Sequence, residues 1–96
     1  MATTLQLPEA TTIDQVPALR EQWVESLAEV GAGELQVQAG QMQSFDTSTL
    51  ALLLDAQRTL QRQGGHLVVQ GAPAKLRELA RLYGIDELIF GRTAST

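Results

Sequence analysis

Strand-like and helix-like segments alternate along the chain, and this alternation restricts the fold more than any other feature of the sequence. Strand-like segments lie at residues 4–7, 35–39 and 66–70. The first two alternate polar and apolar residues, and the third is a short apolar run. After each of them, apolar residues return every three or four positions, which is typical of one face of a helix. This order predicts an α/β fold with crossover connections.

Residues that begin and end helices separate these segments. Asp46 or Thr47 can cap the second helix, and Pro73 stands where the third begins. The helical segments end at glycines, namely Gly31 and Gly33, Gly64 and Gly65, and Gly84. The expected apolar faces contain Val16, Leu19, Trp23, Leu27 and Val30 in the first helix, Leu50, Leu53, Leu54, Gln57 and Leu60 in the second, and Leu76, Leu79, Ala80 and Tyr83 in the third.

Two segments have a less regular pattern. Residues 40–45 are expected to form a loop with a short extended piece at Met42 or Phe45. A final short apolar segment consists of Ile85, Leu88, Ile89 and Phe90, and its pattern fits either a strand or a last helical turn.

Length and composition restrict the class of protein. A chain of 96 residues builds one hydrophobic core, so we expect a single domain over 1–96. With 7 Lys and Arg against 11 Asp and Glu, the net charge of −4 excludes a broadly basic nucleic-acid-binding protein. The absence of Cys and the single His predict neither a metal site nor a cofactor that needs such ligands.

Targeting signals are also missing from the sequence. The N-terminal residues lack the cationic and apolar regions of a secretory signal. The longest apolar run, at 50–54, is much shorter than the about twenty residues of a membrane span. We therefore expect a cytoplasmic protein that does not insert into the membrane.

No enzyme motif stands out. The glycines do not form a phosphate-binding loop, and a Gly-x-Ser-x-Gly turn does not occur. His66 begins a strand and is interpreted as an exposed edge residue, and Asp86 and Glu87 as a solvated turn. The sequence therefore predicts a protein that is not an enzyme.

The most distinctive segment is Asp46-Thr47-Ser48-Thr49-Leu50, where a carboxylate and three hydroxyls precede a strongly apolar helix. The first turn of a helix has unpaired N–H groups and a partial positive charge. A phosphate on one of these hydroxyls would be stabilised by the helix end but repelled by Asp46, which would make a charge switch. The alternative is an ordinary capped helix with surplus polar residues.

This segment resembles the hallmark turn of STAS domains, which usually reads Asp-Ser-Ser/Thr-Gly-Leu and opens the second main helix. The resemblance continues through Leu52-Leu53-Leu54, the segment 63–65, the strand 67–71 and the string Leu-Ala-Arg-Leu-Tyr-Gly-Ile at 79–85. It covers 46–85 by motif and the first half by element order. The strings are most similar to the MlaB-like branch. The resemblance implies a small mixed β-sheet of about four strands with about three to four helices.

The resemblance also implies partner-binding residues, namely Asp46, Thr47, Ser48, Thr49 and Leu50. Asp46 matches the Asp that opens the turn. Thr47 matches the Thr of MlaB-like proteins that is implied to contact an ATPase. Ser48 matches the residue that kinases phosphorylate in anti-sigma factor antagonists. Thr49 stands where the family usually has Gly, and we expect it to add bulk close to the docking surface.

MlaB-like proteins are cytoplasmic STAS subunits of the Mla phospholipid ABC transporter, which maintains outer-membrane lipid asymmetry. The resemblance therefore implies a non-enzymatic adaptor that docks onto the ATPase subunit, peripheral to the inner membrane, and supports its assembly and activity. The first alternative is an anti-sigma factor antagonist whose partner is a serine kinase that phosphorylates Ser48. The second is a nucleotide-binding or small-molecule-binding module, which no phosphate loop supports.

Three further residues have two interpretations each. Trp23 lies on the apolar face of the first helix, where it belongs to the core or serves as an interface anchor. Arg58 and Arg62 are four residues apart, so they lie on one solvated face or meet an acidic partner surface.

Overall fold

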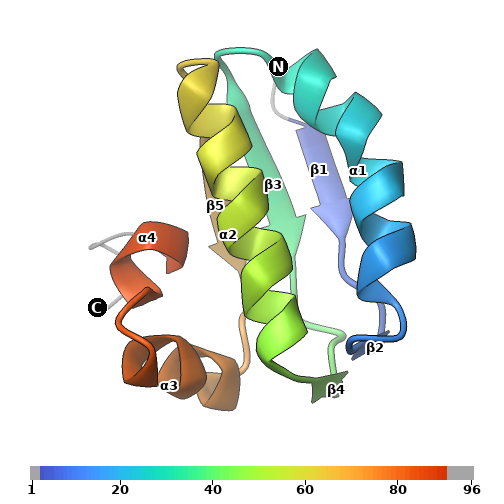
Figure 1. Cartoon of the computed structure of the whole chain (residues 1–96), viewed down its shortest axis with the longest axis vertical. Helices are drawn as coiled ribbons and strands as arrows, with labels where there is room; N and C mark the ends of the chain where they lie inside the picture. The colour runs from blue at the N-terminus through green and yellow to red at the C-terminus, as the bar shows by residue number, and fades with distance from the viewer. Residues whose placement is uncertain (1–2, 91–96) are drawn as a thin grey trace.

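The computed structural model describes residues 3–90, and its elements follow the predicted alternation (Figure 1). The strands are β1 (Thr3–Gln6), β2 (Ala10–Thr11), β3 (Glu34–Gln38), β4 (Ser44–Phe45) and β5 (His66–Gln70). The helices are α1 (Val16–Val30), α2 (Thr47–Arg62), α3 (Ala74–Leu82) and α4 (Asp86–Phe90).

The main sheet is parallel and has the order β1-β3-β5. Its register aligns Thr4 with Gln36 and Gln36 with Val68. A second, two-stranded sheet pairs β2 with β4, also in parallel, and aligns Thr11 with Phe45. The predicted α/β class is confirmed, whereas the expected mixed sheet is parallel in every pairing within residues 3–90. A helix lies in the connection between each pair of strands, and such crossovers allow parallel pairing.

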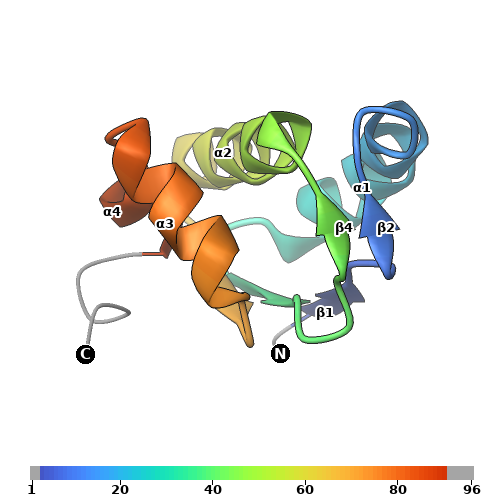
Figure 2. The same cartoon turned by 90° about the horizontal axis from the view of Figure 1, so that it is seen from below.

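The helices cover one face of the main sheet. Figure 2 shows α1 and α2 on the same side of the strands, with α3 and α4 beside them. Side chains from this face and from the helices form one buried cluster, which includes Leu35, Val37, Leu67 and Val69 of the strands, Trp23 and Leu27 of α1, Leu53 and Leu60 of α2, and Leu76 of α3. Because burying each large apolar side chain contributes about 1.5–3 kcal/mol, this layer packing is the main source of stability.

The opposite face of the sheet carries mainly polar side chains around Val68, and no helix within residues 3–90 covers it (Figure 2). Gln38 of β3 donates to the Gln70 side chain of β5 at 2.6 Å. The Glu34 carboxylate accepts a hydrogen bond from Gln36 at 3.0 Å and lies 3.0 Å from Nε2 of His66. These two hydrogen bonds, the one from Gln36 first, hold the pKa of Glu34 below its ordinary value.

The observed elements differ from the predicted ones mainly in short segments. β1 and β3 each begin and end one residue earlier than predicted, although Leu7 still donates its N–H to the carbonyl of Gln38 at 2.9 Å. β2 was not predicted, because two residues are too few to show a period. The extended piece expected within 40–45 is β4, and the segment 85–90 contains the helical alternative, α4.

Tyr83 and Trp23 lie in different environments although both were predicted on apolar helix faces. Tyr83 is 56% exposed, because α3 ends at Leu82 and the chain turns at Gly84, which has a φ of +72°. Its prediction as a core residue is therefore wrong. Trp23 is 3% exposed within the buried cluster, so the structure places it in the core and leaves no indole surface for a partner.

The C-terminal ends of α1 and α2 approach each other closely at Gly65. A Cβ atom on Gly65 would lie 2.6 Å from the carbonyl oxygen of Gly33 and 2.8 Å from that of Gly31. The Gln63 side chain spans the same contact and donates to the carbonyls of Leu27 and Gly31, both at 3.0 Å. The Gly64-Gly65 pair therefore permits close helix packing as well as ending α2.

Candidate functional site

Asp46 fixes the start of α2 and joins it to the turn before α1. Its backbone is extended, and one carboxylate oxygen, Oδ1, accepts the N–H of Ser48 at 2.8 Å. The other, Oδ2, accepts the N–H of Ile13 at 3.1 Å. The N–H of Asp46 in turn donates to the hydroxyl of Thr49 at 3.3 Å, which completes a capping box. One carboxylate thus orders two segments that are far apart in the sequence.

Thr49 faces the interior rather than a docking surface. Its side chain is 0% exposed, and its hydroxyl donates to the backbone carbonyl of Thr11 in β2. This differs from the expectation that Thr49 adds bulk near a partner. Thr49 stands where the STAS turn usually has Gly, and its hydroxyl ties α2 to the small β2–β4 sheet. Leu50 is also buried, at 2% exposed.

Thr47 and Ser48 carry the hydroxyls of this turn that reach the surface. Thr47 is exposed and Ser48 is half-buried. Successive residues of a helix project about 100° apart, so the two hydroxyls lie on different sides of α2. Ser48 lies two turns before Asp55, which pairs with Arg20 of α1 at 3.7 Å, so Ser48 is on the flank toward α1. Thr47 lies on the side toward α3.

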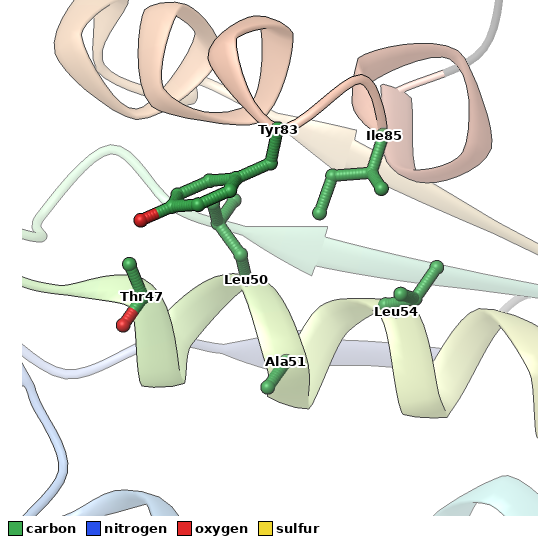
Figure 3. Close-up of a pocket in the computed structure, with 6 residues that line it drawn as sticks. All are labelled: Thr47, Leu50, Ala51, Leu54, Tyr83 and Ile85. Carbon is green, nitrogen blue, oxygen red and sulfur yellow. The ribbon is translucent and has the colours of Figure 1, made fainter.

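An open groove runs between α2 and the segment that follows α3. Its volume is about 370 Å³, and we call it the α2–α3 groove. Figure 3 shows the Tyr83 ring above Leu50, with Ile85 and Leu54 toward the other end. The residues that line it are Thr47, Leu50, Ala51, Leu54, Tyr83 and Ile85. Thr47 turns its methyl group toward Tyr83, and the Tyr83 hydroxyl is a polar side-chain group in this mainly apolar lining (Figure 3).

Sequence reasoning identified one wall of the groove and missed the other. It singled out Thr47 and Leu50 but placed Tyr83 in the core, and it gave Ile85 no role in a site. The signal for both residues was Gly84, since a glycine that ends a helix turns the chain and changes which side chains face inward. Gln57 supports the same region, because its side chain donates to the carbonyl of Leu88 at 3.0 Å and holds α4 against α2.

A further exposed apolar side chain lies beside the turn. Ile13 is 66% exposed, and its backbone is held next to α2 by the carboxylate of Asp46. The sequence gave no sign of this, because the contact joins residues 33 positions apart. Ile13 therefore extends the surface around Thr47 and Ser48 on the side away from the groove.

Charged residues contribute little to the groove itself. Arg58 and Arg62 are both exposed on α2, which agrees with a solvated face and leaves them available to an acidic partner. The Arg20–Asp55 pair is exposed on both sides, so it adds at most about 1 kcal/mol. Among residues 3–90, no three His, Asp or Glu side chains gather closely enough to hold a metal ion.

None of the helices in the described part of the chain has the length and apolar character needed to span a membrane. In a comparison with known families, a family model described as "Mlab, STAS domain" aligns with residues 1–90. This range includes the whole turn at 46–50 and every residue that lines the groove. A search of curated proteins found no match to the chain.

Proposed function

Since the chain belongs to the STAS domain family, whose members generally act as binding modules rather than enzymes, we propose that it is an adaptor for a phospholipid-transporting ABC complex. It docks through the α2–α3 groove onto the ATPase subunit of that complex, in the cytoplasm and at the inner membrane. The observation that carries this proposal is the match, across residues 1–90, to a family model described by the Mlab name.

The shape and chemistry of the groove support a docking role. Its floor is apolar, through Leu50, Leu54 and Ile85, and the Tyr83 hydroxyl is a polar group at its rim. Thr47 turns its methyl group toward Tyr83 and its hydroxyl away from it (Figure 3). Protein interfaces commonly combine an apolar centre with a polar rim, and Tyr is enriched among residues that carry binding energy. A partner helix or loop that inserts one aliphatic or aromatic side chain fits this arrangement.

Docking supports assembly by mass action. An adaptor that binds the assembled ATPase more tightly than its separate parts shifts the equilibrium toward the assembled state. The effect needs no chemistry from the adaptor. It requires that the start of α2 be held rigidly, which Asp46 and Thr49 achieve through their contacts with Ile13 and Thr11.

Affinity purification of the tagged chain from its native cells tests the identity of the partner. We expect an ABC ATPase, together with its permease, in stoichiometric amount by mass spectrometry. Recovery of a serine kinase in their place, or of neither, would overturn the transporter assignment.

Thr47→Arg tests the surface. Thr47 is exposed, so the variant should keep its circular dichroism spectrum, whereas the bulky cation at the rim should lower affinity for the purified ATPase at least about tenfold, or 1.4 kcal/mol. Gln22→Arg places the same charge on an exposed position of α1 and should bind normally. Equal affinity of the two folded variants in a calorimetric titration would remove the groove from the interface.

A second function is favoured by one observation, the position of Ser48. In an anti-sigma factor antagonist, a serine kinase would phosphorylate this residue, which is half-buried in the first turn of α2. The phosphate would be favoured by the helix N-terminus but would stand next to the Asp46 carboxylate, which accepts the Ser48 N–H. The test is the intact mass of the protein purified from its native cells. A mass increase of one phosphate group that is absent in Ser48→Ala would establish this alternative.

A further inference from the structure

Within residues 3–90, no strand lies beside the outer edge of β1. β1 is a terminal strand of the sheet and pairs with β3 on one side only. Figure 1 shows β1 at the side of the sheet opposite β5 and α4. An unpaired edge presents a row of free N–H and C=O groups, which is a template for another strand.

The hydrogen-bonding pattern identifies which residues offer these groups. Leu7 donates its N–H to Gln38 in β3 at 2.9 Å, so residues 3, 5 and 7 direct their backbone groups toward β3. Backbone groups alternate in direction along a strand. Thr4 and Gln6 therefore direct their N–H and C=O groups outward, and both side chains are exposed.

The edge also lacks the devices that usually block strand addition. Proteins protect exposed edges with charged side chains, prolines within the strand, or bulges. The segment 3–7 contains neither a charge nor a proline, and its register with β3 is continuous. Pro8 stands only after the edge has ended.

We propose that this edge binds a second copy of the same chain, with the two β1 strands antiparallel across a twofold axis. In this register, Thr4 of one copy pairs with Gln6 of the other, and each pair exchanges both of its backbone hydrogen bonds. Leu5 then meets Leu5 of the other copy at the axis, where opposite side chains share one face of the sheet. The two sheets become one continuous sheet with the helices of both copies on the same side.

The chemistry of the edge favours a copy of itself over another partner. The two outward residues, Thr4 and Gln6, are complementary to their own copies under twofold symmetry, as an isologous interface requires. A neutral strand offers a charged peptide no complementary group. Leu5, which is half-buried in the single chain, becomes further covered by its counterpart.

The outer flank of α1 adds apolar surface near the same axis. Arg20 points toward α2, since it pairs with Asp55. With about 100° between successive residues, Leu19 and Val30 lie on the other flank of α1, where they pack against the edge of the core. Both are half-buried, and Figure 1 shows α1 on the β1 side of the molecule. The α2–α3 groove lies away from this edge and stays open in the dimer.

Cysteine cross-linking tests the register, because the chain contains no Cys of its own. Under mild oxidation, Leu5→Cys should form a disulfide-linked dimer, since opposite residues of a non-hydrogen-bonded pair approach within disulfide range. Gln70→Cys, an exposed residue on the opposite edge strand, is the matched control. Equal cross-linking of the two variants would overturn the proposal.

Sedimentation equilibrium on the unmodified chain and on Gln6→Pro provides the second measurement. Proline at position 6 removes an outward N–H but leaves the bonds from β1 to β3, so the fold should be kept. The small interface predicts a weak dimer of the wild-type chain, and the variant should dissociate at least about tenfold more readily. A wild-type chain that is monomeric up to millimolar concentration, or a folded Gln6→Pro variant that associates equally well, would refute β1 pairing.

Discussion

Replacing the buried hydroxyl of Thr49 should destabilise the protein through one identified contact. Thr49→Val keeps the shape of the side chain but removes both the bond to the Thr11 carbonyl and the acceptor for the Asp46 N–H. The Thr11 carbonyl then loses this donor in a region where Thr49 is 0% exposed. Leaving a buried polar group without its partner costs about 1–3 kcal/mol.

The assay is urea denaturation followed by circular dichroism. For a domain of this size, each kcal/mol lowers Tm by about 4–8 °C, so the loss is also visible in a thermal scan. Thr49→Ser is the matched control, because it keeps the hydroxyl and loses only a methyl group, at about 1 kcal/mol. The reasoning would be refuted if Thr49→Val were as stable as the wild type, or clearly more stable than Thr49→Ser.

Three further outcomes follow from other contacts. Asp46→Ala should lower the free energy of unfolding by about 1–2 kcal/mol, as measured by urea titration. Asp46→Asn should lower it by less in the same assay, because Asn also caps helices. Gly65→Ala should cost about 1–3 kcal/mol by the same assay, because its Cβ would lie 2.6 Å from a backbone oxygen of Gly33. The pKa of Glu34 is lower in the folded protein than in the unfolded chain. Its contribution to folding stability is therefore present above its pKa in the unfolded chain, and it is lost as pH falls through its pKa in the folded protein. Gln36→Leu removes the hydrogen bond that is the main cause of the lowered pKa of Glu34. The free energy of unfolding, measured by urea titration, should therefore differ less between neutral and acidic pH in this variant than in the wild type. An unchanged pH dependence would contradict this.

The regular elements could be predicted because their periods extend over several turns or strand residues. The apolar positions of α1 and α2 repeat often enough to identify both helices, and glycines and Asp46 mark their ends. Trp23 was expected on the apolar face of α1, either in the core or as an interface anchor, and the structure places it in the core. Local patterns of this kind depend only on neighbours in the sequence, so they are visible before the fold is known.

The parts that could not be predicted depend on contacts between distant segments. β2 and β4 are two residues each and exist only because they pair with one another. Without β2 there is no reason to turn Thr49 inward, and so its role was missed. Ile13 likewise lies beside α2 because a carboxylate far along the chain accepts its N–H.

These contacts divide the turn at the start of α2 into two kinds of residue. Asp46 and Thr49 point toward other segments of the chain, so their substitution changes stability and changes partner binding only through the fold. Thr47 points to the groove, so its substitution should change binding without changing stability. A measurement of activity alone would not separate these roles, since all three variants would be impaired in cells. Plotting partner affinity against the free energy of unfolding for Asp46→Ala, Thr49→Val and Thr47→Arg separates the two kinds of residue. Thr47→Arg alone should lose affinity at unchanged stability.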